Sequence, residues 1–141
     1  MNGDPASDSR GLSVTLPRDV SAVEDGRRAV LEFLEPLMLD DEVINHLEVV
    51  LEELVSNVVR HADEATHVQL SAYQCDDGIC LCVEDDGAAF NPLQREPHEP
   101  FGKLEDAKLG GLGIPLIKRL SRSVEYDRIG SANRIKVVID A

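Results

Sequence analysis

The stretch from Leu47 to His61, LEVVLEELVSNVVRH, constrains the fold of this chain more than any other. Its apolar residues recur at steps of three and four, which is the period of one buried helix face. They are Leu47, Val50, Leu51, Leu54 and Val58. The stretch therefore predicts an amphipathic helix that packs against the rest of a hydrophobic core.

The same helix carries a polar stripe along one flank of its apolar face. Glu53, Asn57 and His61 are spaced four apart, with Arg60 beside them. At about 100° of rotation per residue these side chains lie on one side of the helix, whereas Glu52 lies on the other. The stripe could be a solvated edge stabilised by pairs at i and i+4, or it could line a pocket.

Length and charge limit the class of protein. A chain of 141 residues suits one domain with a substantial core. Its formal net charge of −13 disfavours sequence-independent binding to nucleic acid and docking on anionic membranes. No apolar run approaches the roughly 20 residues of a membrane span, and the first ten residues lack the apolar core of a signal peptide. We therefore expect a cytoplasmic protein.

Three cysteines lie close together, and two of them fall in a strand-like run. Cys80 and Cys82 point the same way along that strand, which places them poorly for a mutual disulfide. Neither they nor Cys75 form a zinc-binding spacing with the four histidines. We expect reduced, buried thiols and no metal site among them.

The order of expected elements predicts an α+β fold with a mostly antiparallel sheet and its helices on one face. Residues 1–11 are expected to be a flexible tail, and residues 12–141 a single domain. A loop of about twenty residues, 88–108, is long enough to be functional. The expected strands are 12–16, 68–73, 79–85, 124–129 and 133–140, and the expected helices are 19–39, 40–62 and 114–120.

Asp85 ends one of these strands on the same face as Leu81 and Val83. If that face is the core, the carboxylate lies at a buried edge and needs a hydrogen-bond donor. The amine of a purine base is one candidate. A strand-end turn in which Asp85 caps Gly87 is the other interpretation.

The second glycine-bearing motif is Gly110-Gly111-Leu112-Gly113, which directly precedes a predicted helix. Glycines there let the backbone approach a ligand, and the first N–H groups of a helix favour phosphate. The alternative is a hinge at the end of the long loop. Each of these motifs is a weak indicator by itself.

Taken together and in this order, the motifs resemble those of the GHKL ATPase superfamily. Glu53-x-x-x-Asn57-x-x-x-His61 is similar to its N box, Asp85-x-Gly87 to its first glycine box, and residues 110–113 to its second. Within the superfamily the chain most resembles the anti-sigma-factor serine/threonine kinases of the RsbW and SpoIIAB type, which share the run DDGAAFNP at 85–92. The resemblance implies a Bergerat-type α/β sandwich with an ATP lid at about 88–110.

The resemblance also implies a role for each matching residue. Glu53 would be the catalytic general base, Asn57 the ligand of Mg²⁺, and Asp85 the acceptor for the adenine amine. Gly87 would permit close approach of the nucleotide. The second glycine box, Gly110, Gly111, Leu112 and Gly113, would hold the phosphates of ATP.

The implied function is partner switching. The chain would phosphorylate a serine on a STAS-domain anti-anti-sigma protein, sequester a sigma factor, and form a homodimer. One departure from the family pattern, Ala89 where many members have a second glycine, leaves open a non-catalytic anti-sigma binding module. A detached histidine-kinase ATPase domain is disfavoured by Glu53, which an already nucleophilic imidazole does not need, and by the short segment before the first strand.

Overall fold

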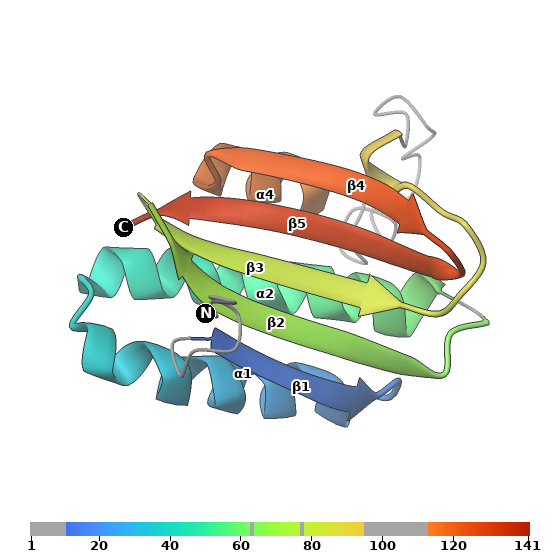
Figure 1. Cartoon of the computed structure of the whole chain (residues 1–141), viewed down its shortest axis with the longest axis horizontal. Helices are drawn as coiled ribbons and strands as arrows, with labels where there is room; N and C mark the ends of the chain where they lie inside the picture. Colours follow the sequence, from blue (N-terminus) through green and yellow to red (C-terminus); the bar gives the residue numbers. More distant parts are fainter. Residues whose placement is uncertain (1–10, 63, 77, 95–112) are drawn as a thin grey trace, which may run out of the picture.

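The structure, a computed structural model, describes residues 11–62, 64–76, 78–94 and 113–141. Its framework is one five-stranded sheet in the order β1-β2-β3-β5-β4, with every neighbouring pair antiparallel (Figure 1). The strands are β1 (Gly11–Pro17), β2 (His67–Cys75), β3 (Gly78–Asp85), β4 (Ser123–Ile129) and β5 (Ala132–Asp140).

The described helices lie on one face of this sheet (Figure 1). They are α1 (Ser21–Leu34), α2 (Asp41–His61) and α4 (Gly113–Leu120), with short 3-10 turns η2 (Glu35–Leu37) and η3 (Pro92–Gln94). The predicted α+β architecture is confirmed, and each strand and helix expected from the sequence is present within a few residues. Most of the expected ATP lid, from 95 to 110, falls outside the described residues, as does the tail before Gly11.

Local sequence explains where the first two helices meet. Pro36 stands in the 3-10 turn after α1, where a proline ends regular helix. Met38 then adopts a left-handed backbone with φ of 58°, which turns the chain into α2. Asp40 occupies the N-cap position, but its side chain makes no capping hydrogen bond. Its main-chain oxygen instead accepts the first helical bond, from Ile44.

The other end of α2 is held by a side chain from the β1–α1 connection. Arg18 donates from Nε to the carbonyl of Val58 at 3.2 Å and from Nη2 to the carbonyl of Val59 at 3.1 Å. The Val58 carbonyl also accepts from the N–H of Ala62, so the guanidinium is a second donor to it. The same guanidinium reaches both carbonyls because its N–H groups form a fork. Arg18 thereby ties the end of α2 to the first strand.

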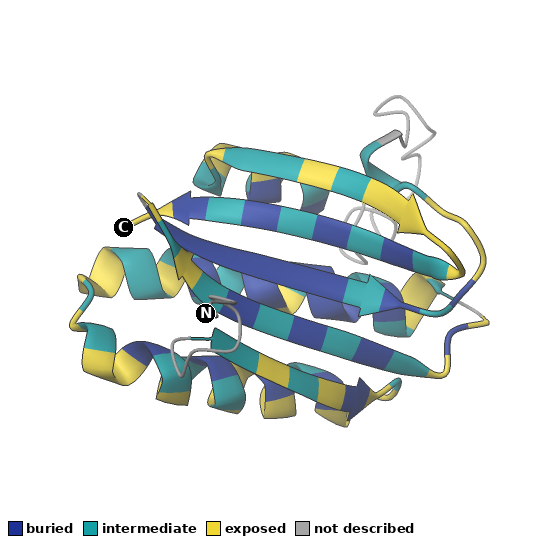
Figure 2. Cartoon of the chain, viewed as in Figure 1, coloured by how far each residue is buried: buried dark blue, intermediate teal, exposed yellow. Residues whose placement is uncertain are grey.

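The core lies between α2 and the central strands. Leu47, Leu51 and Val55 are at most 1% exposed, and the other apolar residues of the predicted helix face are also buried. Figure 2 shows β3 buried along most of its length, as expected for the middle strand of the sheet. The periodicity of 47–58 therefore identified the buried face of α2 correctly.

The cysteines are free, as predicted. Cys80 and Cys82 are buried, whereas Cys75 is only partly buried, so the expectation of buried thiols holds for two of the three. Within the described residues, no group of three or more histidine, cysteine or acidic side chains could hold a metal ion. No helix of the described chain is long and apolar enough to span a membrane.

We expect Leu51→Ala to lower the free energy of unfolding by about 2–5 kcal/mol, because it leaves a cavity where a side chain 1% exposed now packs. Urea unfolding followed by circular dichroism measures this loss. The matched control is Val20→Ala, at a residue that is 86% exposed, which should change the free energy by less than about 0.5 kcal/mol. Equal losses in the two variants would contradict the assignment of the core.

Candidate functional site

The site is centred on Asp85, the last residue of β3. Its side chain lies on the helix-covered face with Leu81 and Val83, as predicted, and the residue is only 8% exposed. The Oδ1 atom accepts hydrogen bonds from the main-chain N–H of Gly87 at 2.8 Å and from Nδ2 of Asn133 at 3.0 Å. The strand-end turn in which Asp85 caps Gly87 is therefore present, and the carboxylate lies at a buried edge.

Gly87 is required by space and not by backbone conformation. Within the described residues the only glycine with positive φ is Gly130. A Cβ at position 87 would lie 3.0 Å from Oδ1 of Asp85 and 3.3 Å from the main-chain nitrogen of Ala65. Ala89, the departure from the family pattern, is exposed and has no positive φ, so its methyl group introduces no backbone strain.

Asp86 fixes the neighbouring loop. Its carboxylate accepts hydrogen bonds from the hydroxyl and main-chain N–H of Thr66 and from the N–H of His67. These bonds hold the pKa of Asp86 well below its ordinary range. They connect the end of β3 to the loop after α2, in which Ala65 packs against Gly87.

Glu53 on α2 reaches the first residue of α4. A Cβ built at Gly113 would collide with Oε1 of Glu53, so the carboxylate fills the space that the glycine leaves. Burial raises the pKa of Glu53, and the nearby charge of Glu52 raises it further, while Arg60 acts in the opposite direction. A partly buried carboxylate with a raised pKa has the properties of a general base.

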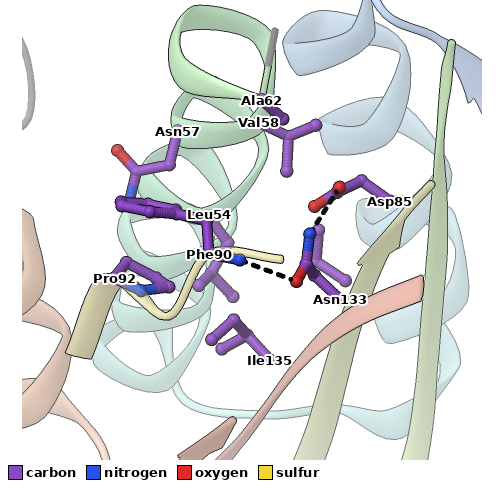
Figure 3. Close-up of a pocket in the computed structure, with 10 residues that line it drawn as sticks. Leu54, Asn57, Val58, Ala62, Asp85, Phe90, Pro92, Asn133 and Ile135 are labelled. Atoms are coloured by element: carbon purple, nitrogen blue, oxygen red, sulfur yellow. Dashed lines mark hydrogen bonds between the residues drawn. The ribbon is translucent and has the colours of Figure 1, made fainter. Parts of the chain in front are cut away.

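A pocket lies between α2 and the strand ends. Its wall combines apolar surface with a few polar groups, as the walls of ligand sites do. The polar groups are Asn57, Asp85 and Asn133 (Figure 3). The apolar lining residues are Leu54, Val58, Ala62, Val83, Phe90, Pro92 and Ile135.

The fold brings together most of the described residues that the sequence singled out. Asn57 and Asp85 line the pocket, Gly87 contacts Asp85, and Glu53 contacts Gly113. Gly110, Gly111 and Leu112 lie outside the described residues. His61 is exposed at the end of α2 and does not line the pocket, so its role stays open.

Asn133 and Phe90 are among the pocket residues to which the sequence analysis gave no role. Asn133, on β5, is 5% exposed and pairs in register with Asp85, and Phe90 lines the pocket from the segment after β3. One signal could have found Asn133. It alternates with Ile135 and Val137 on the buried face of its strand, where a polar residue needs a partner.

The oxygen of the Asn57 side-chain amide is the one candidate metal ligand that the sequence proposed. Mg²⁺ takes hard oxygen ligands, keeps several waters, and is commonly bound by one or two protein oxygens together with substrate phosphates. A single amide oxygen in the wall of a pocket fits such a mode, and the chain would not need a dedicated cage of side chains.

The comparison with protein families decides the assignment. A family model described as the histidine kinase-like ATPase domain matches residues 16–139. The chain belongs to this family. The match covers α2, β3 and α4, the elements that carry Glu53, Asp85 and Gly113.

Curated relatives within this family are serine kinases. The serine/threonine-protein kinase BtrW of Bordetella bronchiseptica is 28% identical over 136 residues, spanning 92% of this chain and 90% of the relative. The serine-protein kinase RsbW of Listeria innocua is 26% identical over 125 residues, spanning 82% of this chain and 80% of the relative. The resemblance to RsbW-type kinases noted in the sequence is confirmed.

Solved structures share the fold. A structure of the SiaB–SiaC complex from Pseudomonas aeruginosa matches with a TM-score of 0.69 at 13% identity, covering 96% of this chain and 93% of the other. A structure of the RsbU and RsbW domains of a Mycobacterium tuberculosis protein also gives 0.69, at 16% identity. It covers 92% of this chain but 32% of that longer one. At these identities the matches support the histidine kinase-like ATPase fold.

We expect Gly87→Ala to weaken the binding of adenine nucleotides roughly tenfold, because the added methyl group presses on Oδ1 of Asp85 and on the main chain at Ala65. Isothermal titration calorimetry with ADP measures the change. The control is Ala89→Gly, at an exposed position outside the pocket lining, which should leave binding unchanged. A larger loss of affinity in Ala89→Gly than in Gly87→Ala would show that position 89, and not position 87, controls the pocket.

Proposed function

We propose that this chain is an ATP-dependent protein serine/threonine kinase of the anti-sigma-factor type. One observation carries the proposal: the Glu53 carboxylate lies against the first residue of α4, while Asn57 and Asp85, from the same set of motifs, line the adjoining pocket. Family membership supports ATP as the phosphoryl donor, and the names of the curated relatives support a serine as the acceptor.

The proposed chemistry assigns one task to each residue. Asp85 accepts a hydrogen bond from the adenine amine, and the apolar lining holds the base. Glu53 accepts the proton of the attacking serine hydroxyl, and its raised pKa makes it a stronger base than an exposed glutamate. Asn57 would hold Mg²⁺, which supplies charge neutralisation at the phosphates when it is bound. Gly113 leaves space for the Glu53 carboxylate at the start of α4.

The proposed substrate is a serine on a STAS-domain anti-anti-sigma protein, and the proposed second partner is a sigma factor that the kinase sequesters. A homodimer and a cytoplasmic location belong to the same proposal. Their support is the resemblance to RsbW-type kinases, now joined by relatives that carry that name. The net charge of −13 is in keeping with a chain that acts through protein partners and not directly on nucleic acid.

A non-catalytic binding module was the alternative suggested by Ala89. The exposed position and ordinary backbone of Ala89 remove the argument for a distorted pocket. A detached histidine-kinase ATPase domain is the less favoured reading, because it gives no role to the carboxylate of Glu53. Kinase assays on a protein substrate distinguish the proposed activity from both.

We expect Glu53→Gln to bind ADP with near-normal affinity but to transfer phosphate to a STAS-domain partner about 10²–10⁴-fold more slowly, because the amide cannot accept the serine proton. Intact-mass spectrometry of the partner after incubation with Mg-ATP measures the transfer. Wild-type rates in this variant would rule out Glu53 as the base.

The matched control is Glu52→Gln, which removes the same charge from the adjacent, exposed position on the opposite flank of α2. At a pH well above the pKa of Glu53 this variant should transfer phosphate at the wild-type rate. If Glu53→Gln and Glu52→Gln slowed the transfer equally, the loss would come from disturbing α2 and not from removing the Glu53 carboxylate.

The transfer rate should fall as the pH drops through the raised pKa of Glu53, since only the ionised carboxylate accepts a proton. Glu52→Gln removes a charge that raises this pKa, so the acidic limb of the rate profile should move to lower pH. Arg60→Met removes a charge that lowers it, so the limb should move to higher pH. Rates measured across pH at constant ionic strength test this, and shifts in the same direction would refute it.

A further inference from the structure

Asn133 is a buried polar residue to which the family resemblance gives no role. It lies on β5 in register with Asp85, and its carboxamide makes four hydrogen bonds. Oδ1 accepts from the N–H of Phe90 at 3.1 Å and from the hydroxyl of Tyr126 at 2.5 Å. Nδ2 donates to the carbonyl of Ala88 at 2.8 Å and to Oδ1 of Asp85 at 3.0 Å. This is the full capacity of an asparagine side chain.

Main-chain groups determine which way round this carboxamide lies. The N–H of Phe90 can only donate, and the carbonyl of Ala88 can only accept. Exchanging the oxygen and nitrogen of Asn133 would therefore place donor against donor and acceptor against acceptor. With the orientation settled, the second hydrogen of Nδ2 must point at Asp85.

The consequence falls on the two oxygens of Asp85. Oδ1 receives two donors, Nδ2 of Asn133 and the main-chain N–H of Gly87. Among the residues that the structure describes, no hydrogen bond to Oδ2 is found. Figure 3 shows the carboxylate at the edge of the space that the pocket residues enclose, with one oxygen bound to Asn133. Oδ2 is therefore the atom left to contact a bound base.

We propose that Asn133 is a positioning residue that makes this pocket select adenine over bases that carry a carbonyl in place of the amine. It does so by fixing the Asp85 carboxylate, whose oxygens are both acceptors, with Oδ2 free to face the base. The inference rests on the proposed function, since it takes the pocket to be the nucleotide site. Adenine presents an amine there, whereas hypoxanthine, which has nearly the same shape, presents an oxygen that Oδ2 repels.

The same geometry makes the selectivity invertible. In Asp85→Asn, the N–H of Gly87 and Nδ2 of Asn133 both donate toward the place of Oδ1. The carbonyl oxygen of the new side chain must therefore take that place. Its NH₂ group must then occupy the place of Oδ2. That group opposes the amine of adenine but donates to the carbonyl of hypoxanthine, so the substitution should exchange the preferred base and not simply abolish binding.

The test uses calorimetric dissociation constants of the full chain for ADP and for IDP, its hypoxanthine counterpart. The wild type should prefer ADP roughly tenfold or more, and Asp85→Asn should shift the ratio of the two constants toward IDP by roughly a further tenfold or more. If Asp85→Asn weakens both nucleotides by the same factor, the positioning role is overturned and the proposed function stands. If the wild type binds neither nucleotide, the proposed function itself fails.

A second variant isolates Asn133. In Asn133→Thr a hydroxyl that both donates and accepts replaces the fixed carboxamide, so it no longer dictates which atom of residue 85 faces it. Because the N–H of Gly87 still donates toward residue 85, the shift toward IDP caused by Asp85→Asn should be smaller in this background but not lost, as a double-mutant cycle reports. A merely structural role would lower the melting temperature and weaken both nucleotides but leave that shift unchanged.

Tyr126→Phe is the matched control for loss of one bond in the network. It removes the hydroxyl that donates to Oδ1 of Asn133 but retains the N–H of Phe90 and the carbonyl of Ala88, which fix the orientation. The variant should keep the wild-type preference for ADP. Loss of the preference here would contradict the argument that the main chain sets the carboxamide.

Discussion

The packing of α2 against the central strands is the contact on which the rest of this structure depends. The apolar side chains on one face of the helix are almost fully buried, and they place Asn57 in the pocket wall and Glu53 against Gly113. Because Glu53 and Asn57 lie one turn apart on the polar flank of α2, their positions follow from the burial of Leu51, Leu54 and Val58. The stability of the core and the positions of Glu53 and Asn57 therefore both depend on α2.

The hairpin of β4 and β5 supports the other side of the pocket. Asn133, which accepts from Tyr126, bonds to the segment after β3, and Arg128 donates to the carbonyl of Gly87 at 2.8 Å. That segment carries no regular structure between Asp86 and Asn91, so these bonds satisfy main-chain groups that a sheet or helix would otherwise pair. A buried network of this kind is rigid only when every member is satisfied, and Asn133 meets that condition.

Much of the fold could be read from the sequence because the elements depend on local patterns. Alternation predicted the strands, and steps of three and four predicted α2. The face of Asp85 followed from counting back to Leu81. The pairing partner of Asp85 could not be derived in this way, because β5 lies far along the chain and its register depends on the whole sheet. Asn133 was therefore overlooked, although its place among buried apolar residues was visible.

The contact between Glu53 and Gly113 has a consequence for how such chains can vary. Their motifs stand far apart in the sequence, but they share one small volume in the fold. A side chain can be added at position 113 only if the acidic group at 53 is shortened or turned aside. The two positions are therefore not free to change independently, and a redesign of the glycine motif has to be made together with the helix that faces it.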